Sequence, residues 1–434
     1  MKLDINYLIV IIIFNISITI IILKISRNYF DQIYLILFNI FILIYSGIGI
    51  SLPNVSKINM LVYFNFVCSF NLTYYIFSNI FRGHNIILSY NSNKNHLLMI
   101  FYLYWIIIIV TIIYPTNNIY YLFNPQITLR NIFERQDKYR NYMVSYILKN
   151  LKLILCPFYY AYLFKYLSKG RIITLFIIEK YIDFAILSYI SRSQIMIYLI
   201  FILLILSYDK NQISYKNYSI KYLRVFLRYL ILFSIILFLI MPYLYDFEFL
   251  RLGASSGNLT STEKLINLIN KEIEYPSNYE LMNTDQYKIP FKEYIKWLIT
   301  LIIPKEIVNI KNIVTINYVY SEKLFGIAYQ GESFSVALPS LLGEGILLYG
   351  SSFSFIHAIL LAIVSSFFVC IYSDNQFSLW NLYIIIQMAI MPRGGSQGPI
   401  SLVINSSVLV ILCSIFQNIK NCKYRGNSLY EGIN

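Results

Sequence analysis

The stretch YLIVIIIFNISITIIIL (Tyr7–Leu23) contains no charged residue, and its length and composition decide the fold class. A helix rises about 1.5 Å per residue, so about 20 apolar residues cross the hydrocarbon layer of a bilayer. The run LLMIFYLYWIIIIVTIIY (Leu97–Tyr114) has the same character. Both runs therefore predict membrane-spanning helices.

The composition of the whole chain points the same way. Of its 434 residues, 58% are hydrophobic and 13% are charged, and the mean hydropathy is +0.61. A soluble domain cannot bury this much apolar surface. We predict an all-α integral membrane protein whose surroundings are the lipid bilayer.

The net charge of +14 has a simple interpretation in a membrane protein. Basic residues gather in cytoplasmic loops, and no basic motif with interleaved aromatic residues indicates nucleic-acid binding. The five cysteines have neither metal-site nor disulfide spacing, and no nucleotide-phosphate loop is present. We expect no nucleic-acid partner, no metal and no cofactor.

Apolar runs and the breaks between them predict about eleven transmembrane helices, within a range of about 10–12. The expected helices are 5–23, 32–52, 58–80, 97–114, 145–167, 172–190, 194–208, 223–244, 354–372, 377–391 and 400–417. They divide the chain into an N-terminal membrane part (1–244), a large outer loop (245–353), and C-terminal helices with a cytoplasmic tail (354–434).

Basic loops predict the sidedness of this arrangement. KYLSKGR (Lys165–Arg171), SYDKNQISYKNYSIKYLR (Ser207–Arg224) and the C-terminal tail are rich in Lys and Arg, which places them in the cytoplasm. The segment 245–353 then lies outside. The loop LRNIFERQDKYRNYM (Leu129–Met143) is also basic but falls outside by alternation, so the side of the N-terminus stays open.

The segment SFSVALPSLLGEGILLYG (Ser333–Gly350) carries one carboxylate, Glu344, between two glycines. It is too short and too rich in glycine for a full span. Ionisable groups at membrane depth are tolerated where they face protein or water. We expect a re-entrant or interfacial segment that covers a cavity, with Glu344 facing that cavity.

This segment, together with LIIPKEIVNIK (Leu301–Lys311), resembles the signature of the O-antigen (Wzy-type) polysaccharide polymerases. Further matching motifs are SRSQIMIY, FLRLG and MPRGG, which carry Arg192, Arg251 and Arg393. The resemblance covers roughly residues 185–417. Lys305 stands where the family usually has arginine, and the proline that usually follows the second lysine is absent.

The resemblance implies a GT-C-like membrane glycosyltransferase of O-antigen or lipopolysaccharide biosynthesis in the bacterial inner membrane. Such an enzyme moves a growing polysaccharide from undecaprenyl pyrophosphate to a new lipid-linked repeat unit at the periplasmic face. A chain-length regulator protein is a candidate partner, and the sequence leaves its binding open. The sugars, the linkage and the inverting or retaining outcome are left open.

The chemistry of this reaction suggests roles for the candidate residues. Guanidinium and ammonium groups suit a pyrophosphate, which predicts a binding set of Arg192, Arg251, Arg393, Lys305 and Lys311. Glu344 and Arg251 are the candidate catalytic residues, with Glu344 either the base or the partner that orients an arginine. His357, early in the next helix, is a further candidate for the same cavity.

Two other functions fit parts of the sequence. IIEKYIDFAIL (Ile177–Leu187) places Glu179 and Asp183 on one helix face, with Lys180 nearby. Such a cluster suits a flippase or transporter of the lipid-linked unit, but the sequence favours a self-paired structural cluster. An O-antigen ligase is the other alternative, but residues 245–334 lack the histidine that ligases usually carry in this loop.

Overall fold

The computed structural model describes residues 5–26, 28–51, 60–83, 93–116, 142–187, 192–207, 228, 260, 263–264, 278–284, 288–302, 315–326, 337–373 and 375–413. The chain forms two compact units, each built from several separate segments. All regular elements among the described residues are helices, as the composition predicts. Five of these helices, including Tyr29–Ile50 and Ser351–Ile371, are long and apolar enough to cross a membrane.

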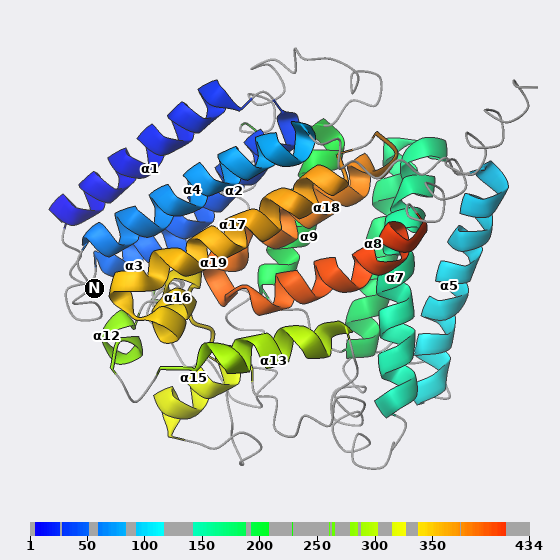
Figure 1. Ribbon diagram of the computed structural model, residues 1–434. Coiled ribbons are helices and arrows are strands. Elements are labelled where there is room, and N and C mark those ends of the chain that lie inside the picture. Colours follow the sequence, from blue (N-terminus) through cyan, green and yellow to red (C-terminus); the bar gives the residue numbers. More distant parts are fainter. Residues whose placement is uncertain are drawn as a thin grey trace, which may run out of the picture. The chain divides into compact units, whose positions relative to one another are not determined.

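The first unit comprises Met1–Asn85, Asp209–Cys370 and Ile384–Ser401. Its elements are α1 (Ile5–Ile25), α2 (Tyr29–Ile42), η1 (Leu43–Gly47), α3 (Ile48–Ile50), α4 (Met60–Gly83), α12 (Tyr279–Met282), α13 (Phe291–Ile302), α15 (Ile316–Phe325), α16 (Leu341–Tyr349), η5 (Ser351–Phe353), α17 (Ser354–Ile371) and α19 (Met391–Gly394). Helices α1, α2 and α4 lie side by side (Figure 1).

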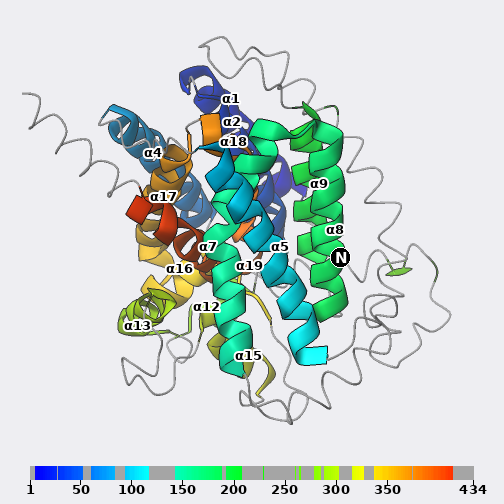
Figure 2. The same ribbon diagram turned by 90° about the vertical axis from the view of Figure 1, so that its right-hand side faces the viewer.

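The second unit comprises Ile86–Tyr208, Ile371–Tyr383 and Leu402–Asn434. Its elements are α5 (Lys94–Thr116), α7 (Tyr142–Tyr166), α8 (Lys169–Leu187), α9 (Arg192–Ser207) and η6 (Asn375–Phe377). Helix α5 packs along α7 (Figure 2). Helix α18 (Ser378–Ala389) and the apolar helix Gln397–Cys413 each begin in one unit and end in the other.

Each expected membrane range contains a helix in the described residues, apart from 223–244, of which only residue 228 is described. The boundaries differ from the expected ones by a few residues, because capping and turns decide where a helix ends. Asn28 is an example: its side chain accepts a hydrogen bond of 2.8 Å from the amide of Phe30, so α2 begins before the first purely apolar residues.

Helix α2 is the most buried of the candidate spans and pairs with α4 through polar and aromatic contacts. The amides of Asn39 and Asn71 exchange hydrogen bonds of 3.1 and 3.0 Å. Near the start of α2, Asp31 accepts a hydrogen bond from Tyr74 and forms an ion pair with Arg82. Polar groups inside a membrane need such partners, so these contacts fix the register of the two helices.

Helix α1 approaches the same pair closely at Gly47, in the π-helical turn η1. A Cβ atom at Gly47 would lie 2.8 Å from Cγ2 of Ile11 and 3.1 Å from the hydroxyl oxygen of Tyr63. A side chain at position 47 would therefore displace Ile11 of α1 or Tyr63 of α4.

Candidate functional site

The candidate site of the first unit is built around α16, the helix formed by the segment with the isolated carboxylate. The hydroxyl of Ser340 caps the helix by accepting a hydrogen bond of 3.1 Å from the amide of Gly343. The helix ends at Gly350, whose φ is +77°. Its nine residues span about 14 Å. A helix of this length is too short to cross a bilayer.

Glu344 lies in the first turn of α16, and its side chain is only 1% exposed. The backbone amide of Ser396 donates a hydrogen bond of 2.6 Å to Oε2, and the hydroxyl of Ser396 donates one of 2.9 Å to Oε1. Both carboxylate oxygens are thus held by one residue. Hydrogen bonds to an ionised acceptor are the stronger kind, and a buried carboxylate needs them.

The close approach of Ser396 depends on the turn that precedes it. Helix α19 ends at Gly394, and Gly395 adopts φ 78° and ψ 175°, a region that is essentially restricted to glycine. A Cβ atom at Gly395 would lie 3.1 Å from Oε2 of Glu344. Glycine at this position therefore both forms the turn and leaves room for the carboxylate.

Ser396 also connects the site to α13. The hydroxyl groups of Tyr294 and Ser396 lie 2.8 Å apart. Because the Ser396 hydroxyl already donates to Glu344, Tyr294 is the donor to Ser396 in this chain of bonds. Burial, with a smaller contribution from the negative charge of Glu344, raises the pKa of Tyr294 above its ordinary value, so the phenol stays protonated.

The neighbouring residue, Gln397, connects the site to helix α15. Its side-chain oxygen accepts a hydrogen bond of 3.0 Å from the amide of Ile316, in the first turn of that helix. The two residues that follow Gly395 therefore join α13, α15 and α16 around one carboxylate. These three helices follow one another within residues 291–349, and the turn that joins them comes from a later segment of the chain.

His357, from α17, is the second titratable group beside the carboxylate. Its Nε2 lies 3.4 Å from Oε2 of Glu344, and the imidazole is 1% exposed. Neither ring nitrogen has a hydrogen-bond partner among the described residues. Gly345 makes the approach possible, because a Cβ there would lie 3.3 Å from Cβ of His357.

The order of contacts limits the chemistry of this site. In a serine hydrolase the histidine contacts the serine, and the carboxylate lies behind the histidine. Here Ser396 binds the carboxylate directly, so Ser396 is placed to hold Glu344 and not to act as a nucleophile activated by His357. A paired carboxylate and imidazole in a buried site suit acceptance of a proton. No metal-binding group of His, Cys, Asp and Glu occurs in the described part of the chain.

The sequence-predicted site residues fall into three sets. Glu344 and His357 are in contact, and Arg393 lies on α19 two residues before Gly395. Arg192 begins α9 in the second unit. The remaining three residues lie outside the described part of the chain: Arg251, Lys305 and Lys311.

Sequence reasoning missed Ser396, Tyr294 and Gln397. Ser396 follows the glycine pair of MPRGG directly, and a glycine pair after a short basic motif is a signal for a turn that exposes the next backbone amide. Tyr294 carried no such signal. It is one of 42 tyrosines, and only the packing of α13 identifies it.

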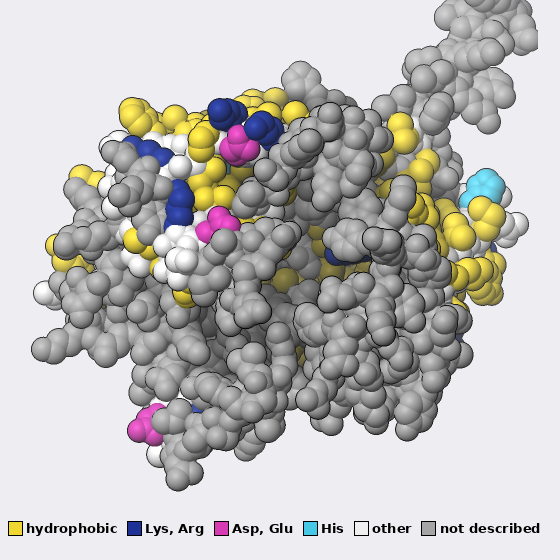
Figure 3. Space-filling model, turned by 90° about the horizontal axis from the view of Figure 1, so that it is seen from below, with side chains coloured by type: hydrophobic (Ala, Val, Ile, Leu, Met, Phe, Trp, Pro, Cys, Tyr) yellow, Lys and Arg dark blue, Asp and Glu magenta, His cyan; other side chains and the backbone are white. Residues whose placement is uncertain are grey.

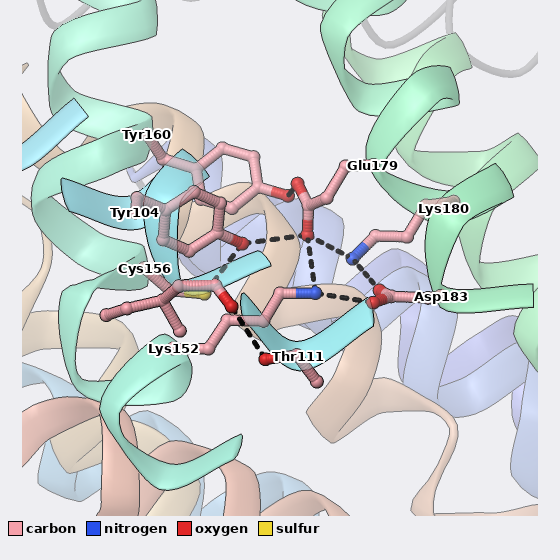
Figure 4. Close-up of polar contacts among 9 residues, drawn as sticks. Tyr104, Thr111, Lys152, Cys156, Tyr160, Glu179, Lys180 and Asp183 are labelled. Atoms are coloured by element: carbon pink, nitrogen blue, oxygen red, sulfur yellow. Dashed lines mark hydrogen bonds and ion pairs between the residues drawn. The ribbon is translucent and has the colours of Figure 1, made fainter. Parts of the chain in front are cut away.

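The second unit contains the acidic pair that the sequence singled out, and Figure 4 shows its surroundings. Lys180 lies 2.7 Å from Oε1 of Glu179 and 3.4 Å from Oδ2 of Asp183. Lys152, from α7, lies 2.5 Å from Oδ1 of Asp183 and 3.6 Å from Oε1 of Glu179. Two cations thus balance two anions.

Aromatic side chains close this cluster. Tyr104, from α5, donates a hydrogen bond of 2.8 Å to Glu179, which has no exposed surface. The ammonium of Lys180 lies 5.5–5.7 Å from the ring centres of Phe176, Tyr198 and Tyr383, within the range of cation–π attraction. The charges are paired within the cluster, as expected for a structural contact between α5, α7 and α8.

We compared the chain with protein-family models, curated proteins and solved structures, and none of them matches it.

Proposed function

We propose that this chain is a membrane glycosyltransferase that polymerises lipid-linked oligosaccharide repeat units. The growing chain would leave undecaprenyl pyrophosphate and join a new repeat unit on the same carrier at the periplasmic face of a bacterial inner membrane. The proposal rests on the polymerase-like motifs of the sequence. The observation that supports it best is the contact between two of those motifs, in which Ser396, directly after MPRGG, holds Glu344 of LLGEG by two hydrogen bonds.

The chemistry assigns a role to each group. A hydroxyl of the acceptor sugar attacks the anomeric carbon of the growing chain, and the bond from that carbon to the pyrophosphate oxygen breaks. The hydroxyl proton passes to the Glu344–His357 pair, whose atoms lie 3.4 Å apart. The lipid pyrophosphate leaves as an anion and needs cations nearby.

Arg393 is the proposed pyrophosphate ligand that the Gly395 turn connects to this pair, because it precedes Gly395 by two residues. Arg251, Arg192, Lys305 and Lys311 complete the proposed cationic set on the strength of the resemblance. Arginine suits the task because its planar guanidinium makes two parallel bonds to a phosphate. A chain-length regulator remains a proposed partner.

The flippase alternative depends on the Glu179 cluster. A transport pathway needs ionisable groups that exchange partners, whereas Glu179 and Asp183 each lie within ion-pair distance of both lysines. This pairing favours a structural role, so the flippase stays the second choice. The ligase differs from the polymerase in its acceptor only, and the same experiment separates them.

The test is deletion of the gene, followed by display of the surface polysaccharide on a gel. Loss of a polymerase leaves single repeat units on the lipid core. Loss of a flippase or a ligase removes the repeat units altogether, and that outcome would contradict the proposal. Complementation with Arg192→Ala, Arg251→Ala or Arg393→Ala at matched expression then tests the cationic set. Full ladders from all three variants would show that these arginines do not hold the pyrophosphate.

A further inference from the structure

Helix α13 has a broad apolar face, of which one half is buried and the other half is partly exposed; at its start, the ring centre of Phe291 lies 5.6 Å from that of Tyr349 on α16. Tyr294 and Trp297 are buried, and Tyr294 donates to Ser396. Phe291, Ile295 and Ile299 are 40%, 38% and 40% exposed. The two sets are neighbours around the helix, so the apolar sector continues from the buried side onto the open side without a polar break.

The open half has the geometry of a stripe. Residues four apart along a helix stack above one another, and Phe291, Ile295 and Ile299 fall within an arc of about 80°. The exposed Lys292 lies about 20° beyond this arc. The exposed Lys288 precedes the helix by three residues.

Around the helix, the polar side of α13 lies next to the edge that carries Lys292. Lys296 forms an ion pair of 2.8 Å with Glu293, which lies on the side of the helix away from the stripe. The helix therefore presents, in order, a buried apolar edge, a partly exposed apolar stripe, a basic edge and a polar side that carries both signs of charge. Figure 3 shows the molecule from below, where basic, acidic and hydrophobic side chains of the described residues lie close together in one part of the surface.

This order distinguishes a lipid surface from other occupants. An amphipathic helix in the bilayer interface buries an apolar stripe among acyl chains and keeps basic residues at its margin, where they meet anionic headgroups. A helix bound by a second protein helix usually has its apolar stripe flanked by charges of both signs. Here the charged residues nearest the stripe, Lys292 at its margin and Lys288 before the helix, are both positive.

We propose that α13 docks on an anionic bilayer surface through Phe291, Ile295 and Ile299, with Lys288 and Lys292 on lipid headgroup phosphates. The opposite edge of the same helix holds Ser396 through Tyr294 and thereby borders the Glu344 site. The docking does not depend on the proposed glycosyl transfer. Whether or not the chain transfers sugars, α13 would contact the membrane surface on one edge and the Glu344 site on the other.

The test places an environment-sensitive fluorescent amino acid at position 295 of the full-length chain by codon suppression. The protein is studied in nanodiscs with and without brominated lipids, which quench a fluorophore among acyl chains. We expect a blue-shifted emission at position 295 that brominated lipid quenches several-fold more than the same fluorophore at position 293. Position 291 should behave like 295. Quenching at 291 and 295 no stronger than at 293 would overturn the docking.

The lysine contacts have their own measurement. In the position-295 protein, quenching by brominated lipid should increase when phosphatidylglycerol replaces part of the neutral lipid. The double variant Lys288→Gln/Lys292→Gln should lose this dependence while keeping the blue-shifted emission. An equal dependence on phosphatidylglycerol in both proteins would show that these lysines do not meet the headgroups. Deletion phenotypes of the polysaccharide test the proposed function separately, so either idea can fail alone.

Discussion

The backbone amide of Ser396 lies 2.6 Å from Oε2 of Glu344, although 52 residues separate the two in sequence. Both residues are buried, and the serine hydroxyl binds the second carboxylate oxygen. The site is therefore held by a turn of the main chain as well as by side chains. Substitution of the carboxylate should therefore affect activity, whereas substitution in the turn should affect stability.

Glu344→Gln should abolish long polysaccharide chains if the carboxylate accepts the acceptor proton. General-base catalysis contributes about 10²–10⁴-fold, so polymerisation by the variant should fall by at least about 100-fold. Transfer of radiolabelled lipid-linked repeat units in membranes measures this rate. The matched control is Glu293→Gln on α13, whose ion pair with Lys296 is partly exposed and should matter little. Equal activity of both variants would remove Glu344 from the reaction.

Gly395→Ala should destabilise the protein by about 1–3 kcal/mol, because its backbone conformation is disfavoured for residues with a Cβ. The added methyl group would also press on Glu344. The control is Gly398→Ala, since a Cβ at Gly398 meets nothing within 4 Å and alanine favours a helix. Thermal unfolding in detergent measures both. If the two variants unfold at the same temperature, the turn is not the constraint described above.

Lys152→Met should destabilise the second unit by about 3–5 kcal/mol, because it leaves Glu179 and Asp183 with one cation between them. The double variant Lys152→Met/Asp183→Leu restores the balance of charge and should recover much of that loss. A double-mutant cycle of unfolding free energies yields the coupling between the two residues. Additive losses would show that the pair contributes no coupling energy.

Tyr294 provides a prediction on pH. Burial raises its pKa in the folded protein above the value of about 10 expected in the unfolded chain. The unfolded chain therefore releases the proton first, and this contribution to stability is complete below pH 10 and declines as the pH rises further. Tyr294→Phe should make the loss of stability above about pH 10 less steep, as measured by unfolding at several pH values. Slopes that coincide would mean that Tyr294 ionises equally in both states.

The helical membrane fold follows from the length of uncharged runs such as Tyr7–Leu23, because a bilayer demands helices of that length. The Glu344 segment was expected as a short, glycine-rich element, and α16 is a short helix. The glycine pair of MPRGG signals a turn before Ser396, but the pairing of Ser396 with Glu344 could not be predicted, because it depends on a long-range approach that requires the fold of α19. Lys152 was missed for a similar reason: it appears as one more basic residue until α7 packs beside α8.

The polar contacts between α2 and α4 have a consequence for how the chain enters the membrane during synthesis. Asp31 and Asn39 leave the ribosome well before Arg82 and Asn71, the groups that satisfy them. Until α4 emerges, α2 carries a carboxylate and an amide side chain without these partners. We therefore expect the translocation machinery to retain α2 and to release it into lipid together with α4, as a hairpin that is already paired.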